Sequence, residues 1–176
     1  MLMALETTQR AETFISIGIS NICSSASEFE IKIPQLIEPS KPGRRQPLLR
    51  LPFFHDSPEL WVGHTLNRYI EVTQPIRGNI TQLFVTTKKP HKAASVQTLN
   101  NWLKSVLAEC GLSEFTGHNT RYAFASAAFA ERVDLNVLKN AAGWSEKSKT
   151  FDKFYKRPIV QPNTTLAEQV IRNKRK

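Results

Sequence analysis

The sequence predicts an α+β fold, a mostly helical domain with a small antiparallel sheet. Three observations support this prediction. The chain has 176 residues, 40% of them hydrophobic, which is enough for one compact core. Apolar residues recur at helical spacing in several segments, whereas residues 29–33 alternate as a strand does. Glycine and proline separate these segments, so the predicted elements are short.

The N-terminal half contains the predicted sheet. Leu2 to about Ile17 has apolar residues at helical spacing and predicts a first helix. After the strand at 29–33, the segments Gln35–Glu38 and Leu48–Leu51 flank a basic turn and predict a hairpin. Ser57-Pro58 is an N-cap followed by a first-turn proline and begins the next helix. The apolar side of that helix comprises Leu60, Trp61, Leu66, Tyr69 and Ile70.

After this helix the chain is predicted to be helical apart from one short strand at Leu83–Val85. Ser95 caps a helix that ends at Gly111. Asp134 caps another, which ends at Gly143. The helices expected after position 111 span residues 120–130, 135–142, 145–158 and 166–176, the last capped by Thr164 or Thr165. We assign residues 1–158 to one domain and residues 159–176 to a basic C-terminal helix or tail.

The charge of the chain predicts a polyanionic partner, nucleic acid before an acidic membrane surface. The formal net charge is +9 and the pI is about 9.8. Residues 1–40 have five acidic and two basic side chains, whereas residues 139–176 have ten basic and three acidic ones. A further basic cluster consists of Lys41, Arg44, Arg45 and Arg50. Solvated surface is the alternative explanation for such runs.

Several classes of protein are excluded by what the sequence lacks. No segment approaches the ~18 apolar residues of a membrane-spanning helix, and the acidic start does not resemble a signal peptide. Cys23 and Cys110 cannot form a disulfide framework, which favours a reducing compartment. The four histidines are too scattered for a metal site, and no glycine-rich phosphate loop occurs. We therefore expect no metal and no small-molecule cofactor.

His118 and Arg121 form the motif whose side chains can bind an anion and take part in a reaction. A spacing of three residues places both side chains on one face of a helix, where they can bind one anion together. Arginine donates a fork of hydrogen bonds to two phosphate oxygens, and histidine donates one more or transfers a proton. Alone the motif is weak, because a capping histidine beside a surface arginine also explains it.

The order of residues along the chain strengthens the motif. Arg10 lies upstream in Leu5-Glu-Thr-Thr-Gln-Arg, and Trp144 follows Ala141-Ala-Gly. Tyr155 lies in Thr150-Phe-Asp-Lys-Phe-Tyr-Lys-Arg-Pro. This order of residues resembles the catalytic domain of tyrosine recombinases, the phage integrase family. It runs from arginine through a hairpin lysine, His-x-x-Arg and tryptophan after glycine to tyrosine. The resemblance covers the chain from Arg10 to about Pro158.

Four short phrases are most similar to the eukaryotic mobile-element branch of that family, the DIRS-type and Crypton-type recombinases. They are Leu51-Pro-Phe-Phe, Lys89-Pro-His-Lys, Ala142-Gly-Trp-Ser and Phe154-Tyr-Lys-Arg-Pro. This resemblance implies a transposable element that recombines or integrates DNA in the nucleus. It also implies double-stranded DNA as partner and a homotetramer on that DNA.

The resemblance implies a role for each site residue in breaking and rejoining DNA without metal or cofactor. Tyr155 is the nucleophile and forms a 3′-phosphotyrosine, while Arg10 and Arg121 hold the non-bridging oxygens. His118 assists proton transfer, and Lys41 is the general acid for the leaving 5′-oxygen. Trp144 packs against the phosphate or hydrogen-bonds to it through its indole N–H. The residues expected to contact DNA are Arg44, Arg45, Lys153, Lys156 and Arg157.

Each site residue also has an alternative explanation. Arg10 is flanked by Glu6 and Glu12 and fits an ion pair. Trp144 and Tyr155 fit core positions, and Lys41 competes with other hairpin residues for the place of the acid. An alignment that sets Glu38 at that place would indicate weakened or lost activity.

At the level of function, a degenerate or domesticated recombinase fragment would bind DNA without cutting it. A type IB topoisomerase-like relaxase is the third interpretation. Relatives carry an N-terminal DNA-clamping domain, so the chain resembles an N-terminally clipped member.

Overall fold

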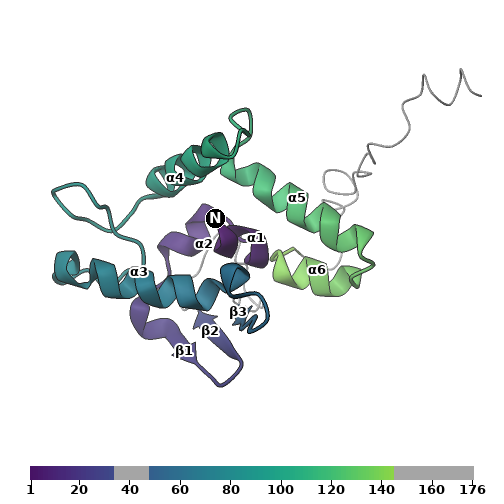
Figure 1. The fold of residues 1–176 in the computed structure, drawn as a ribbon, viewed down its shortest axis with the longest axis horizontal. Helices are drawn as coiled ribbons and strands as arrows, with labels where there is room; N and C mark the ends of the chain where they lie inside the picture. Colours follow the sequence, from purple (N-terminus) through teal and green to yellow (C-terminus); the bar gives the residue numbers. More distant parts are fainter. Residues whose placement is uncertain (34–47, 145–176) are drawn as a thin grey trace, which may run out of the picture.

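Helices α1 (Leu2–Thr7) and α2 (Ala11–Ile15) occupy the centre of the fold. In the computed structural model, which describes residues 1–33 and 48–144, they lie between the sheet and α3 (Val62–Arg77) on one side and α4 (Val96–Glu109) and α5 (Gly117–Ala130) on the other (Figure 1). Helix α6 (Leu135–Ala141) packs against α5. The predicted class is confirmed: the domain is mostly helical with one small antiparallel sheet.

The sheet has three antiparallel strands in the order β1 (Ile22–Ser24), β2 (Glu28–Lys32) and β3 (Leu48–Pro52). The alternation predicted for β2 is present, because Phe29 and Ile31 are buried while Glu30 between them is only partly buried and Lys32 is exposed. Leu49 and Leu51 of β3 pair with Ile31 and Phe29 and complete the buried face. The short β1 escaped prediction, since three residues carry no readable alternation. The strand expected at Gln35–Glu38 lies outside the described residues.

The single helix predicted over residues 2–17 is wrong, because the chain bends between α1 and α2. Thr8 adopts the left-handed conformation at φ 53°, and Arg10 is extended at φ −89° and ψ 159°. A non-glycine residue in the left-handed region ends a helix. The apolar spacing continued across the bend, because both short helices bury side chains in the same core.

Two other predictions required correction in the middle of the chain. Ser57-Pro58 begins a 3₁₀ turn, Pro58–Leu60, and α3 starts only at Val62. Leu60, predicted on the apolar side, is consequently 51% exposed. Leu83–Val85 is no strand: Leu83 donates to the carbonyl of Ile17, and Val85 forms an isolated bridge with Ala93. The segment is buried, but no neighbour runs beside it far enough to make a ladder.

The caps predicted at Ser95 and Asp134 are confirmed. The Ser95 hydroxyl accepts from the Thr98 N–H at 3.1 Å, and the Asp134 carboxylate accepts from two N–H groups of α6. Helix α5 begins at Gly117, three residues before its predicted start. The helices predicted at 145–158 and 166–176 lie outside the described residues.

The described residues form two hydrophobic clusters. The larger, the main core, joins α1, α2, the inner face of the sheet, α3 and the start of α4. The smaller, the α5–α6 core, is built on Ala125 and Leu138 with Tyr122, Leu135 and Trp144 beside them. No helix in residues 1–33 and 48–144 is long and apolar enough to cross a membrane.

Candidate active site

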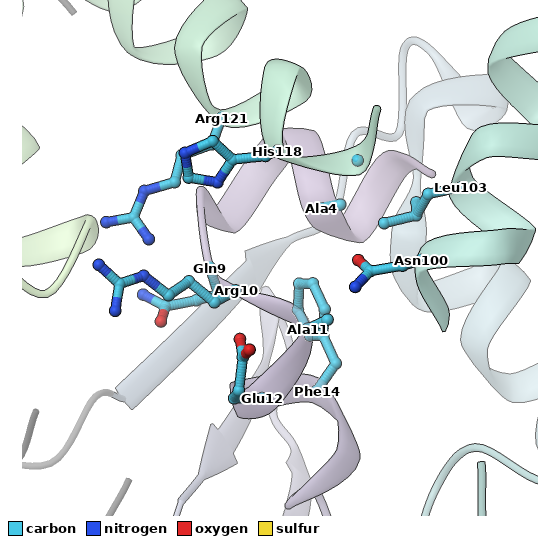
Figure 2. Close-up of a pocket in the computed structure, with 11 residues that line it drawn as sticks. Ala4, Gln9, Arg10, Ala11, Glu12, Phe14, Asn100, Leu103, His118 and Arg121 are labelled. Atoms are coloured by element: carbon cyan, nitrogen blue, oxygen red, sulfur yellow. The ribbon is translucent and has the colours of Figure 1, made fainter. Parts of the chain in front are cut away.

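A pocket of about 350 Å³ lies where α1, α2, α4 and α5 meet. The functionally interesting side chains around it are Arg10, Glu12, His118 and Arg121. Figure 2 shows Arg10 reaching in from the α1–α2 bend and His118 and Arg121 from the first turn and a half of α5. The two guanidinium groups extend to the same side of the view, one above the other. Residues more than a hundred positions apart in sequence are therefore brought together as predicted.

Arg10 is exposed and is placed by its backbone. It is the N-cap residue of α2, and no hydrogen bond or ion pair joins its guanidinium to the described residues. The alternative interpretation, an ion pair with Glu6 or Glu12, is wrong for this structure. An exposed guanidinium beside a pocket has its hydrogen-bond donors available to an anion.

The N-terminus of α5 is anchored by a capping box and a close contact. The Asn119 side-chain oxygen accepts from the Thr116 N–H at 2.8 Å. Gly117 follows, and a Cβ there would lie 2.6 Å from Cδ1 of Leu103 on α4. Glycine thus allows α5 to approach α4 closely, which brings His118 to the pocket wall.

His118 is biased toward its neutral form. Burial lowers its pKa from the usual 6.5, and the positive charges of Arg121 and then Arg10 lower it further, while Glu12 acts in the opposite direction. Its ring meets Tyr122 edge to face at 4.9 Å between centroids. A neutral imidazole at neutral pH can accept a proton from a reacting hydroxyl.

Arg121 is buried, with 3% of its surface exposed, yet it borders the pocket. Its Nη2 donates to the carbonyl of Ala142 at 2.5 Å, and its Cζ lies 5.1 Å from the ring centroid of Trp144. The turn that presents Trp144 depends on Gly143 at φ 67°, after α6 ends. Trp144 therefore supports Arg121 instead of lining the described pocket.

The charges around the pocket favour an anion. Two guanidinium groups and an imidazole face one carboxylate, that of Glu12. Within residues 1–33 and 48–144, no three His, Cys, Asp or Glu side chains gather as a metal site would need. The chemistry available to this arrangement is phosphate binding with one group able to move a proton.

The remaining predicted site residues lie outside the described residues. They are Lys41, Arg44, Arg45, Lys153, Tyr155, Lys156 and Arg157. Two residues that sequence reasoning missed lie at the pocket: Gln9, beside Arg10, and Asn100 on α4. Asn100 carried no signal, because a polar residue next to an apolar helical stripe is ordinary surface.

Comparisons with known proteins identify a family and proteins of similar fold. The family model described as the phage integrase family matches residues 1–159. The structure of XerH site-specific recombinase bound to difH substrate, a pre-cleavage complex, has a TM-score of 0.65 and 18% identity over 89% of this chain and 41% of its own.

XerA recombinase matches with a TM-score of 0.62 and 14% identity, over 98% of this chain and 55% of its own. A lambda integrase dimer bound to a COC′ core site matches with a TM-score of 0.59 and 15% identity, over 94% of this chain and 43% of its own. The chain thus spans about half the length of these proteins or less. No curated protein sequence matches it.

Proposed function

The chain belongs to the phage integrase family, and from this membership we propose that it is the catalytic domain of a tyrosine recombinase that breaks and rejoins DNA. The observation that carries the proposal is the convergence of Arg10, His118 and Arg121 on one pocket. Family membership without that convergence would support a fold alone, and the convergence without the family would support only an anion site.

The proposed reaction uses the pocket as a phosphate clamp. Arg10 and Arg121 bind the non-bridging oxygens and stabilise the charge that develops on them. The Tyr155 hydroxyl oxygen attacks phosphorus, neutral His118 accepts its proton, and the 5′-oxygen leaves with a proton from Lys41. A phosphotyrosine conserves the bond, so rejoining reverses these steps. Trp144 acts by holding Arg121, a change from the direct phosphate contact that its position in sequence suggested.

The proposed substrate is double-stranded DNA. Its support is the net charge of +9 and the DNA-bound state of the XerH and lambda integrase structures. Arg44, Arg45, Lys153, Lys156 and Arg157 are proposed to contact its backbone. Lambda integrase has been solved as a tetramer bound to a Holliday junction, and we propose a homotetramer on DNA for this chain as well.

Three finer points remain proposals from sequence resemblance. We propose that the chain comes from a DIRS-type or Crypton-type mobile element, that it integrates or recombines the DNA of that element, and that it acts in the nucleus. Their support is the set of short phrases around Leu51, Lys89, Ala142 and Phe154.

Covalent trapping tests the proposed function. The 176-residue chain is incubated with nicked duplexes carrying the ends of the element, and denaturing gels reveal protein attached to DNA. The variants are Tyr155→Phe, Arg121→Lys and Arg77→Lys. Arg77 is the matched control, because it is also 3% exposed and bonded to backbone carbonyls, but it lies away from the pocket.

The expected result is an adduct with wild type and Arg77→Lys, none with Tyr155→Phe, and at least a hundredfold less with Arg121→Lys. An adduct that survives Tyr155→Phe contradicts the assigned nucleophile. DNA binding by wild type without any adduct contradicts catalysis and favours the fragment that holds DNA without cutting it. Relaxation of supercoiled plasmid without sequence preference would favour the topoisomerase interpretation.

A further inference from the structure

The pocket lies between the two hydrophobic cores of the described structure. Arg10 projects from the bend between α1 and α2, which belong to the main core. Arg121 lies on α5, and Trp144, which follows α6, packs against the α5–α6 core and the Arg121 guanidinium. The separation of the two guanidinium groups therefore depends on how firmly the α1–α2 bend is connected to the α5–α6 pair. A phosphate clamp needs that separation to be fixed closely.

Arg10 cannot fix the separation by itself. Its guanidinium has no hydrogen bond or ion pair with the described residues, and its side chain is exposed. Its position consequently follows from the backbone of the bend, where Thr8 is in the left-handed region. Any group that anchors this bend therefore also fixes the backbone position from which the Arg10 side chain extends.

Gln9, the residue before Arg10, is such an anchor. Its Nε2 donates to the carbonyl of Ala141, the last residue of α6 and 132 positions away in sequence. Its Oε1 accepts from the hydroxyl of Thr13 on α2 at 3.1 Å. One side chain thus connects α2, the bend and the C-terminus of α6. Figure 2 shows Gln9 immediately beside Arg10, on the same side of the pocket.

The carbonyl that Gln9 binds is next to the one that holds Arg121. Arg121 donates to Ala142, and Gln9 donates to Ala141. The last carbonyls of a helix lack intrahelical partners and carry partial negative charge, so they are suited to accept both donors. The C-terminus of α6 therefore positions both arginines of the clamp. It binds Arg121 directly, and it holds Arg10 through the neighbouring residue Gln9.

We propose that Gln9 is a positioning residue, which sets the distance between Arg10 and Arg121 by joining the α1–α2 bend to the C-terminus of α6. The inference rests on the proposed function for its catalytic consequence, but not for its geometry. The bond is exposed to solvent, so water competes for it and its loss changes overall stability little. Its effect should appear at the phosphate clamp, in phosphate affinity and in the rate of the chemical step, and not in folding.

Three substitutions separate the two ends of the Gln9 side chain. Gln9→Leu removes both bonds. Gln9→Glu keeps the acceptor for Thr13 but turns a negative carboxylate toward the Ala141 carbonyl, at the negative end of α6. Thr13→Val removes only the Thr13 bond and is the matched control. Positioning through Ala141 predicts that the rate falls most in Gln9→Glu, less in Gln9→Leu and least in Thr13→Val.

The first measurement is the single-turnover rate of adduct formation at saturating DNA, together with the Kd for DNA and the Tm. We expect a rate loss of tenfold or more for Gln9→Leu, a larger loss for Gln9→Glu, and less than threefold for Thr13→Val. The Kd for DNA should rise by no more than the Kd for phosphate does, and the Tm should stay within about 2 °C of wild type. Equal rates in all four proteins, or a loss in Thr13→Val as large as in Gln9→Leu, would overturn the proposal.

The second measurement does not need catalysis. Inorganic phosphate is titrated into wild type, Gln9→Leu and Thr13→Val while the Nε–H resonances of Arg10 and Arg121 are followed by NMR. We expect both resonances of wild type and of Thr13→Val to move with one Kd, and Gln9→Leu to bind at least tenfold more weakly.

The titration also separates the two proposals. Wild type that binds phosphate but forms no adduct contradicts the recombinase function and leaves the Gln9 test intact. Equal phosphate affinity in wild type and Gln9→Leu overturns the role of Gln9. Wild type that binds no phosphate overturns both.

Discussion

Arg77 and Arg121 are buried to the same extent and held in similar ways, yet one of them borders the candidate active site and the other does not. Each has 3% of its surface exposed. Arg77 donates to the carbonyls of Gln82 and Leu83 and lies 5.7 Å from the Tyr69 ring centroid. Arg121 donates to Ala142 and lies 5.1 Å from the Trp144 centroid. The difference is that Arg121 also borders the pocket with Arg10 and His118.

This comparison separates a structural arginine from a functional one. Arg77 connects the end of α3 to the buried segment around Leu83, and its hydrogen bonds go to that segment and to Thr73. Arg121 donates to a helix end and also borders the pocket. Burial and backbone hydrogen bonds make a guanidinium rigid, and rigidity becomes useful for catalysis only where the group also meets a ligand.

Replacing either buried arginine by alanine has the largest expected effect. Arg77→Ala and Arg121→Ala should each lower the free energy of unfolding by about 2–4 kcal/mol, because backbone carbonyls lose a charged donor and a cavity remains. Only Arg121→Ala should also abolish covalent trapping at temperatures where both variants are folded. Thermal unfolding and trapping at 15 °C check this. Loss of trapping in folded Arg77→Ala would show that the comparison is mistaken.

Arg10→Ala is the complementary case, with activity lost and stability kept. Its exposed guanidinium makes no bond to the described residues, so the Tm should stay within about 2 °C of wild type. Adduct formation should fall at least a hundredfold, since half of the phosphate clamp is gone. A large drop in Tm would instead assign Arg10 a structural role like that of Arg77.

The sequence singled out side chains that meet at one pocket, but it did not predict the backbone that presents them. Arg10, His118 and Arg121 are chemically distinctive and keep a readable order, and the caps at Ser95 and Asp134 depend on local hydrogen bonds alone. The bend at Thr8 could not be predicted, because threonine has no preference for positive φ and the apolar spacing runs through it. The role of Trp144 as a support for Arg121 depends on where α5 and α6 meet, which is a tertiary contact.

Glu6 differs from the two buried arginines, because its buried charged group has no hydrogen-bond partner among the described residues. Both of its carboxylate oxygens are buried, and neither has a hydrogen-bond partner among the described residues. Burial raises its pKa from 4.5 to about 7. The folded state therefore binds the proton more tightly than the unfolded state, and this contribution to stability is present below pH 4.5 and lost as the pH rises through 7.

Glu6→Gln should remove that loss. At pH 8 the variant should be more stable than wild type by about 1 kcal/mol, after allowance for solvent screening at this half-buried position, or about 3 °C in Tm. At pH 4, below the unfolded-state pKa, the two proteins should unfold at nearly the same temperature. Thermal unfolding at both pH values checks this, and a variant less stable than wild type at pH 8 would mean that the carboxylate has a cationic partner.

The smallest expected effect is on the pKa of His118. Variants that each remove one charge test how the neighbouring groups act on this pKa. Arg10→Ala removes a positive charge that lowers the His118 pKa, so that pKa should rise toward 6.5. Glu12→Gln removes the opposing negative charge, so the pKa should fall. Arg77→Ala should leave it unchanged, since Arg77 is not among the charges that act on His118. NMR titration of the His118 ring proton measures all three.

The sign of the His118 effect can also be read from stability. Because the folded-state pKa is lowered, the neutral ring is favoured in the folded protein, and its contribution to stability is present above pH 6.5 and lost as the pH falls. Arg10→Ala should therefore lose less stability than wild type between pH 7 and pH 5. Shifts of the same sign in Arg10→Ala and Glu12→Gln would mean that the imidazole responds to a change of packing and not to the charges of a phosphate site.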